Sequence, residues 1–239
     1  MDSADHGRDG LREGLIAWPP GWHVREVTET GSTNVDLLAL ADTAEDRTVL
    51  RTDHQTAGRG RLDRRWDAPP GANLLVSILF KRVPDDPGEL TRRVGLAIVD
   101  AVLATADVAA TLKWPNDVLV DDRKLAGILA QRAASGPVVV GAGVNVRWAP
   151  DGAASLGDLD PRTVLAALLH AFDELPSDIG VRYSTSLGTL GRRVRIERTT
   201  DELVGTAVGV EPDGRLIVLD GCAITHRIDV GDVVHLRPA

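Results

Sequence analysis

The stretch TLKWPNDVLVDDRKLAGILA, residues 111–130, predicts three short strands joined by two turns. Thr111–Trp114 is expected to form the first strand and leads into a Pro-Asn-Asp turn. Val118–Val120 and Leu125–Ala130 flank the tight turn Asp121–Lys124, which is the pattern of a β-hairpin. We expect the rest of the fold to build outward from these strands.

Apolar patterns before and after residues 111–130 predict further strands and helices. Short apolar or alternating runs predict strands at residues 23–29, 48–52, 74–80 and 138–146. Periodicity and start signals predict helices at residues 35–41, 88–106, 160–175 and 178–189. Ser32 or Thr33 could cap the first of these, and Asp160 with Pro161 opens the third. From Arg193 onward, alternation and two Asp-Gly turns predict a small all-β barrel of about five strands.

Composition narrows the class of protein. The chain has 239 residues, 43% of them hydrophobic, so it can build a core, and a largely disordered chain is excluded. No apolar run approaches the roughly 18–20 residues that span a bilayer, and the first residues do not resemble a secretory signal. The net charge of −8 argues against binding nucleic acid by bulk charge. We expect a cytoplasmic enzyme, with residues 1–22 as a flexible leader.

The segment GRGRLDRRW, residues 58–66, concentrates positive charge in an acidic protein. Its glycines let the backbone approach a ligand, and its arginines offer forked donors suited to phosphate or carboxylate. Trp66 could stack on a flat ring. A solvated basic loop is the alternative, and the interleaved glycines favour an anion site over it.

Two further segments are ambiguous by themselves. In KWPND, residues 113–117, Asn116 offers an amide and Asp117 a carboxylate, but Pro-Asn-Asp is also ordinary turn chemistry. Lys124 at a hairpin tip would usually face solvent, whereas Gly127 soon after it suggests a ligand close to the backbone.

Other chemistries lack their motifs. The sequence contains no G-x-x-x-x-G-K-[ST] loop, no H-E-x-x-H and no G-x-S-x-G. GAGVN at 141–145 ends a strand, so it does not fit a dinucleotide fingerprint, which opens a helix. The six histidines are dispersed, which argues against a zinc cluster, and the single cysteine, Cys222, excludes an internal disulfide. We expect Cys222 to be a small buried residue of a barrel strand.

Taken in order, these segments resemble the biotin–protein ligases. The resemblance covers residues 23–239, and its motifs are ETGSTN at 29–34, QTAGRGR at 55–61 with Arg64 and Trp66, KWPND at 113–117, RKLAGI at 123–128 and GAGVN at 141–145. It implies an α+β fold, in which a mixed β-sheet with helices packed on one side, like that of class II aminoacyl-tRNA synthetases, precedes an SH3-like β-barrel. The implied boundaries are 23–189 for the catalytic domain and 190–239 for the barrel.

The resemblance also implies a reaction. Such an enzyme makes biotinyl-5′-AMP from biotin and MgATP, and then passes the biotinyl group to one lysine of a carrier domain. That carrier belongs to a biotin-dependent carboxylase acting on acyl-CoA or pyruvate. About 22 residues precede the matching region, too few for a DNA-binding unit, so we expect no repressor activity.

Roles for individual residues follow from the same resemblance. Residues implied at the biotin site are Ser32, Thr33, Asn34, Gln55, Arg59, Gly60, Arg61, Lys124 and Gly127. Residues implied around ATP or the adenylate are Arg64, Trp66, Asn116, Asn145 and Lys124. Lys124, Arg59 and Arg61 would be catalytic because their charges stabilise the reacting phosphate, and Asp117 would be a partner of Mg²⁺ or of the loop.

Three rival functions are weighed against this one. A lipoate–protein ligase shares the fold and the chemistry, but the Gly-Arg-Gly-Arg and Lys-Trp-Pro-Asn-Asp segments favour biotin. A nucleic-acid-binding regulator is disfavoured by the negative net charge, and we expect neither DNA nor a membrane as partner. An inactive biotin-binding scaffold is disfavoured by Lys124, Arg59 and Arg61. The sequence leaves monomer and homodimer equally open.

Overall fold

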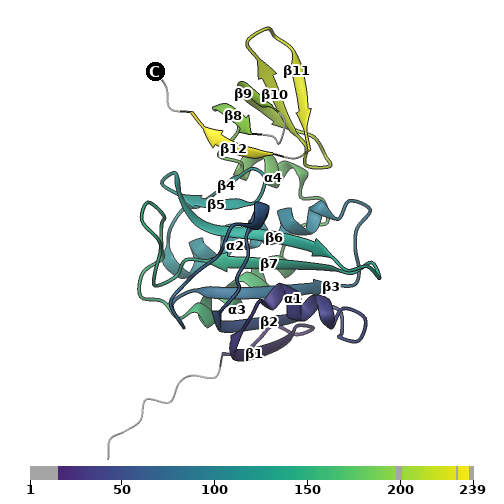
Figure 1. The fold of residues 1–239 in the computed structure, drawn as a ribbon, viewed down its shortest axis with the longest axis vertical. Helices are drawn as coiled ribbons and strands as arrows, with labels where there is room; N and C mark the ends of the chain where they lie inside the picture. Colours follow the sequence, from purple (N-terminus) through teal and green to yellow (C-terminus); the bar gives the residue numbers. More distant parts are fainter. Residues whose placement is uncertain (1–15, 198–200, 230, 237–239) are drawn as a thin grey trace, which may run out of the picture.

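The computed structural model describes residues 16–197, 201–229 and 231–236, and its first domain is built on a seven-stranded sheet (Figure 1). The strand order is β1-β2-β3-β7-β6-β5-β4. β1 and β2 are parallel and every other neighbouring pair is antiparallel, so the sheet is mixed, as expected. The strands are β1 His23–Thr30, β2 Thr48–Gln55, β3 Leu74–Phe80, β4 Thr111–Lys113, β5 Asp117–Val120, β6 Arg123–Arg132 and β7 Val138–Val144.

Helices cover both faces of this sheet. They are α1 Thr33–Ala39, α2 Gly88–Ala106, α3 Pro161–Asp173 and α4 Gly180–Ser186, with a short 3-10 turn at Arg61–Asp63. α2 and α3 pack together behind the sheet, and α1 lies in front of it (Figure 1). The expectation of helices on one side is therefore wrong for α1.

The alternation of β3 explains this arrangement. Leu74, Val76 and Ile78 belong to the large core under α2 and α3, whereas Leu79 belongs to a second cluster with Leu37 of α1. Successive strand residues point to opposite faces, and β3 is buried on both, so its sequence is almost continuously apolar.

The predicted side-chain cap is confirmed for α3 and is wrong for α1. Asp160 caps α3, since its carboxylate accepts from the backbone N–H of Arg162, and Pro161 is the first helical residue. Ser32 stands at the cap position of α1 but makes no capping hydrogen bond, and α1 begins at Thr33. The hydroxyl of Thr33 instead reaches into the site described below.

The segment expected as a leader contributes to the core at its end. Residues 1–15 lie outside the described chain. Trp22 is buried, meets Phe172 edge-to-face, and donates from Nε1 to Asp173 at 2.9 Å. An indole with a hydrogen-bonded N–H gains from burial, so this end of the segment is fixed to α3.

The C-terminal part is a five-stranded antiparallel sheet with the order β11-β10-β9-β8-β12. This agrees with the expected small barrel of about five strands. Cys222 is exposed, so its expected burial is wrong: it lies in the turn after Asp220, whose carboxylate accepts from its N–H. The strands are β8 Arg193–Glu197, β9 Glu202–Val210, β10 Leu216–Asp220, β11 Thr225–Ile228 and β12 Asp232–His235.

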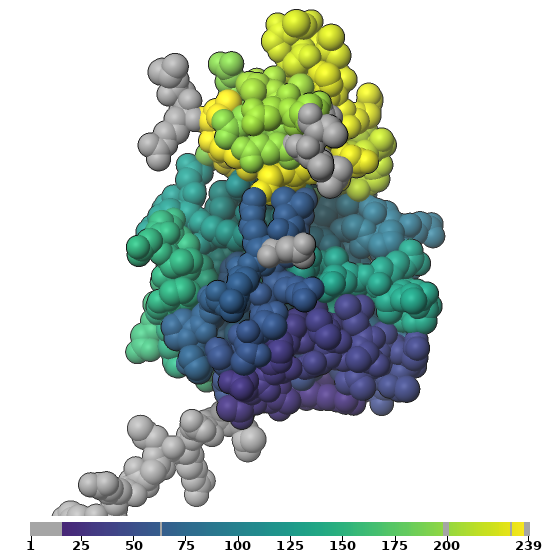
Figure 2. Space-filling view, viewed as in Figure 1, coloured from purple at the N-terminus to yellow at the C-terminus, as the bar shows by residue number. Residues whose placement is uncertain are grey.

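The C-terminal sheet sits on the β4–β5 end of the first domain (Figure 1), and the space-filling view shows it packed against that end of the molecule (Figure 2). Trp114 donates from its indole Nε1 to the carbonyl of Gly214 at 2.8 Å. Arg92 of α2 donates to the carbonyl of Asp213 at 2.8 Å while pairing with Asp86 at 2.6 Å. Two side chains of the first domain thus hold one turn of the second. Within the described residues, no helix has the length and hydropathy to cross a membrane.

Candidate active site

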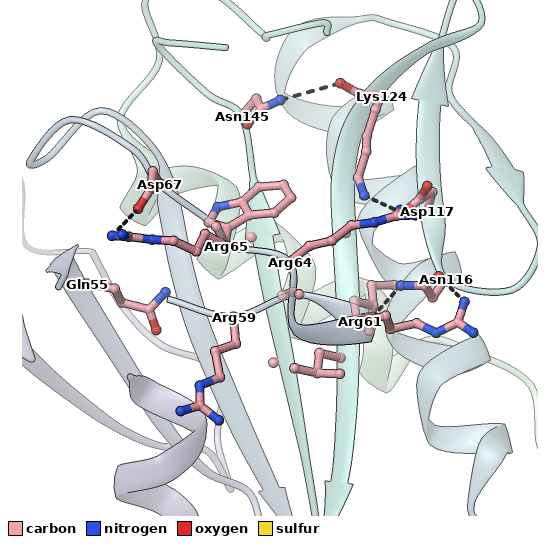
Figure 3. Close-up of a pocket in the computed structure, with 18 of the residues that line it drawn as sticks. Gln55, Arg59, Arg61, Arg64, Arg65, Asp67, Asn116, Asp117, Lys124 and Asn145 are labelled. Carbon is pink, nitrogen blue, oxygen red and sulfur yellow. Dashed lines mark hydrogen bonds and ion pairs between the residues drawn. The ribbon is translucent and has the colours of Figure 1, made fainter. Parts of the chain in front are cut away.

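A cavity of about 360 Å³ opens along β6 and β7 beneath the 58–66 loop (Figure 3). Every residue that the sequence singled out for the site lines it, although those residues come from five separate motifs. They are Ser32, Thr33, Asn34, Gln55, Arg59, Gly60, Arg61, Arg64, Trp66, Asn116, Asp117, Lys124, Gly127 and Asn145.

The middle of the cavity is flat and apolar. Gly127 of β6 and Gly143 of β7 are direct partners across the sheet, and the indole of Trp66 lies over both. A Cβ at Gly143 would come within 2.3 Å of Trp66 Cε2, and one at Gly127 within 3.1 Å of Cζ3. Glycine is required here for close approach rather than for an unusual backbone angle. The indole Nε1 is buried and has no hydrogen-bond partner among the described residues.

One end of the cavity is neutral and polar. The side-chain carbonyl of Gln55 accepts from the Thr33 N–H at 2.9 Å, and the Thr33 hydroxyl lies 2.6 Å from that of Ser77. Ser77 donates to the side-chain oxygen of Asn34, and the side-chain nitrogen of Asn34 donates to the carbonyl of Leu129 at 3.1 Å. These groups hold one another in place by hydrogen bonds, and none carries a charge.

Ser77 is a member of this network that the sequence analysis missed. The sequence does contain a signal for Ser77, because it is the one polar residue in the apolar stretch Leu74–Phe80 that forms β3. In the structure its side chain is completely buried. A buried hydroxyl in an apolar strand needs a partner. The partners are Thr33 and Asn34, more than forty positions earlier in the chain.

Charged side chains line the rest of the cavity. Five are basic and three are carboxylates: Arg59, Arg61, Arg64, Arg65, Lys124, Asp67, Asp117 and Asp232. Lys124, Arg64 and Asp117 lie together at one end, whereas Arg59 and Arg65 lie on the side of Gln55 (Figure 3). Lys124 Nζ pairs with Asp117 Oδ1 at 2.6 Å and lies 5.6 Å from the centre of the Trp66 ring. Lys124 therefore points into the cavity, although a hairpin-tip lysine would ordinarily face solvent.

The arginine loop is folded rather than loose. The Gly60 N–H donates to the Arg64 carbonyl at 2.6 Å, and the Trp66 N–H donates to the Gly58 carbonyl at 3.0 Å. Arg61 donates to the side-chain oxygen of Asn116 at 3.0 Å (Figure 3). Arg59 makes no ion pair with any described residue. This geometry favours the anion-site interpretation over a solvated basic loop.

The side chains of Asn116 and Asn145 form hydrogen bonds with other residues of the protein. Asn116 donates to the carbonyl of Ile128 at 2.7 Å and accepts from Arg61. Asn145 is buried, donates to the carbonyl of Ala154 at 3.1 Å and accepts from the Asn73 amide at 3.3 Å. Both side chains thus fix the walls of the cavity.

Asp232 is the second residue that the sequence analysis missed. It begins β12 in the C-terminal sheet, yet it lines the cavity and pairs with Arg64. No local pattern could have found it, because 168 positions separate the two residues. Among the described residues, no three His, Cys, Asp or Glu side chains are grouped as metal ligands.

Two family models match the sequence. Residues 24–145 match the biotin/lipoate A/B protein ligase family, and residues 189–236 match the biotin protein ligase C terminal domain. A biotin–[acetyl-CoA-carboxylase] ligase from Mycobacterium tuberculosis is 39% identical over 95% of this chain and 94% of its own length. One from Paracoccus denitrificans is 34% identical over 80% of this chain and 92% of its own.

Solved structures agree on the fold. The biotin protein ligase from Aquifex aeolicus, in complex with biotin and ATP, gives a TM-score of 0.78 at 24% identity. It covers 90% of this chain and 99% of its own. The ligase from Leishmania major, in complex with biotinyl-5-AMP, gives 0.61 at 25% identity, over 89% of this chain and 100% of its own. With both parts of the sequence matched and close relatives along nearly all of it, the chain belongs to the biotin protein ligase family.

Proposed function

We propose that this protein is an ATP-dependent biotin–protein ligase. The observation that supports it best is one cavity that holds three features: a neutral polar cluster around Thr33 and Gln55, a glycine floor under Trp66, and a charged cluster around Lys124 and Arg64 (Figure 3). Biotin presents the matching sequence of groups, namely an uncharged ureido ring, an apolar body and a carboxylate. The relatives named above carry the same activity in their names.

The first half-reaction joins the carboxylate of biotin to the α-phosphate of ATP, and pyrophosphate leaves. Both reactants are anions, so their approach is opposed by charge. In this proposal Lys124 lies beside the carboxylate and the α-phosphate, and Arg64 holds phosphate. Arg59 and Arg61 belong to the loop that closes over biotin and its adenylate, and they add positive charge there. These fixed charges lower the cost of bringing the anions together and stabilise the charge that develops.

The biotin ring is assigned to the polar end. Gln55, Thr33, Ser32 and Asn34 supply neutral donors and acceptors there, and Ser77 holds two of them in place. Gly60 and Gly127 allow the backbone to approach the ligand closely. The family resemblance assigns Trp66 to the adenine. The indole lies over the glycine floor, where it could equally pack against an apolar ring of the ligand.

Mg²⁺ is assigned to the nucleotide. This ion prefers oxygen ligands and commonly binds through substrate phosphates with one or two carboxylates. Asp117 lines the cavity and is the candidate carboxylate, and its Oδ1 atom is paired with Lys124. The ion would neutralise phosphate charge when it arrives with ATP.

The second half-reaction transfers the biotinyl group to a protein. The amine of one carrier lysine attacks the acyl carbon, the bond to the phosphate oxygen breaks, and AMP leaves. The proposed partner is the biotin carboxyl carrier domain of an acyl-CoA or pyruvate carboxylase, in keeping with the acetyl-CoA-carboxylase named for two relatives.

A lipoate–protein ligase is the competing function, because the family model over residues 24–145 includes both activities. The match of residues 189–236 to a biotin-specific C-terminal domain favours biotin. The test is pyrophosphate release from MgATP with biotin, with lipoate and with neither. Release that requires biotin supports the proposal. Release with lipoate alone, or none from folded protein, contradicts it.

A further inference from the structure

The arginine loop of the first domain is tied to the first residues of β12 in the second. Arg64 pairs with the carboxylate of Asp232, and Arg61 Nη1 lies 3.9 Å from the same group. Arg61 also donates to the carbonyl of Gly231 at 3.2 Å. The Asp232 side chain is 23% exposed, so this contact is partly shielded from solvent.

The carboxylate of Asp232 lies where it pairs with arginines whose charges are assigned to the phosphates. A guanidinium presents the same fork of donors to a carboxylate and to a phosphate. If Arg61 and Arg64 hold nucleotide phosphates, the phosphates and the carboxylate of Asp232 need the same donor groups. A carboxylate left beside a bound polyphosphate would also repel it.

We propose that Asp232 is a positioning residue that competes with the phosphates of the nucleotide for Arg61 and Arg64, and that the phosphates displace it. This inference rests on the proposed function, since it names what sets the ATP affinity of that site. It has two consequences. Asp232 keeps the loop folded when no ligand is present, and it weakens ATP binding by competing for the same donors.

A consequence follows for the second domain. Asn116 still holds Arg61 when Asp232 lets go, so the loop keeps one anchor on the first domain. The second domain loses the ion pair of Asp232 with the loop at that moment, while Arg61 still donates to Gly231, and Trp114 and Arg92 still hold the domain at Gly214 and Asp213. Nucleotide binding thereby frees the side chain of Asp232 and leaves the domain attached.

The test compares wild type with Asp232→Asn, which keeps the shape of the side chain and removes its charge. An exposed or partly exposed ion pair is worth up to about 1 kcal/mol, so we expect the KM for ATP to fall about twofold to fivefold. The KM for biotin should stay the same. Asp232→Glu should restore the wild-type KM for ATP. A merely structural role would raise KM or lower kcat, so an unchanged or higher KM for ATP overturns the proposal.

Two readouts do not depend on ligase activity. Trypsin should cut the ligand-free Asp232→Asn protein within residues 58–66 several times faster than wild type, and tripolyphosphate should bind the variant more tightly by calorimetry. Glu202→Gln is the control, since it removes one carboxylate from β9 of the same sheet, and it should change neither. If both readouts respond while biotin causes no pyrophosphate release, the proposed function fails and the Asp232 inference stands.

One measurement requires no variant. Hydrogen exchange of the backbone at residues 231–235 should become faster when wild-type protein binds biotin and MgATP, because the ion pair to Arg64 is broken. Slower or unchanged exchange there overturns the displacement, even if Asp232→Asn does not fold.

Discussion

Gly127 and Gly143 face each other across β6 and β7, and the indole of Trp66 rests on both. The pair forms the one part of the cavity where two strands offer bare backbone to an aromatic ring. A methyl group on either residue would meet that ring at 3.1 Å or less.

Gly143→Ala should therefore expel Trp66 from the cavity. The added Cβ would lie 2.3 Å from the ring, and the loop that carries Trp66 can move more easily than β7 can. We expect adenylate formation to fall by about tenfold or more, since small displacements at a site have large effects on rate. The measurement is biotin-dependent pyrophosphate release, with tryptophan emission followed in parallel.

Gly209→Ala is the matched control for this change. Gly209 also lies in a strand, but a Cβ there would meet Ile217 at an ordinary 3.4 Å. It should leave both signals as in wild type. Full activity of folded Gly143→Ala would show that the indole need not rest on the glycine floor.

Lys124→Ala tests the cation beside the reacting groups. Removing a preorganised charge from a developing anion commonly costs about a hundredfold or more in rate. Thermal stability should change little, because an ion pair with a partly exposed lysine contributes at most about 1 kcal/mol. Arg123→Ala removes the adjacent cation, whose contact with Asp121 is a loose 4.0 Å, and should keep its activity. Wild-type turnover by Lys124→Ala would remove this lysine from the mechanism.

Arg61→Gly should weaken retention of the adenylate. The change removes the hydrogen bond to Asn116 and the one to Gly231, which together hold the loop over the cavity. Two such hydrogen bonds from a charged group predict release about tenfold faster or more. The measurement is the loss of labelled adenylate during a chase with unlabelled biotin. Arg82→Gly, at a 95% exposed side chain outside the cavity, should release it at the wild-type rate.

His235 provides a prediction about pH. Burial lowers the pKa of His235 to about 4, and the charges of Arg192 and Lys113 act in the same direction, opposed by Asp122. Thr189 accepts from the Trp114 N–H at 3.1 Å, so its own hydroxyl proton is left for His235 Nε2 at 3.1 Å. The neutral imidazole thus belongs to the folded state.

The sign of the effect follows from this depressed value. Unfolded histidine takes a proton near pH 6.5, whereas His235 in the folded protein takes one only near pH 4. Its contribution to the free energy of unfolding is complete above pH 6.5 and is lost as the pH falls towards 4. Because the ring is partly exposed, we expect about 1 kcal/mol rather than the full shift. Urea titrations of wild type and His235→Gln at pH 7.5 and 5 measure it, and parallel losses in both would contradict it.

Local sequence patterns predicted most of the helices and strands, and they singled out the five motifs that line the cavity. The five motifs carry their own signals, such as glycines among arginines or an amide in a turn, and the sheet brings them together. Ser77 was hidden inside an apolar strand, where its importance comes from packing against Thr33 and Asn34. The role of Asp232 could not be predicted from the sequence, because its ion pair with Arg64 forms only between the two folded domains. Cys222 was misassigned because a turn followed β10 sooner than the strand pattern suggested.

The turn at Gly214 has a bearing on how the protein responds to heat. Trp114 stands three residues before Asp117 in the chain, and its indole is bonded to that turn of the C-terminal sheet. If the sheet melts, this buried tryptophan loses its hydrogen-bond partner, close in the chain to Asn116 and Asp117 of the cavity. The two parts should accordingly give a single calorimetric transition, and activity should disappear along the same curve as the folded signal.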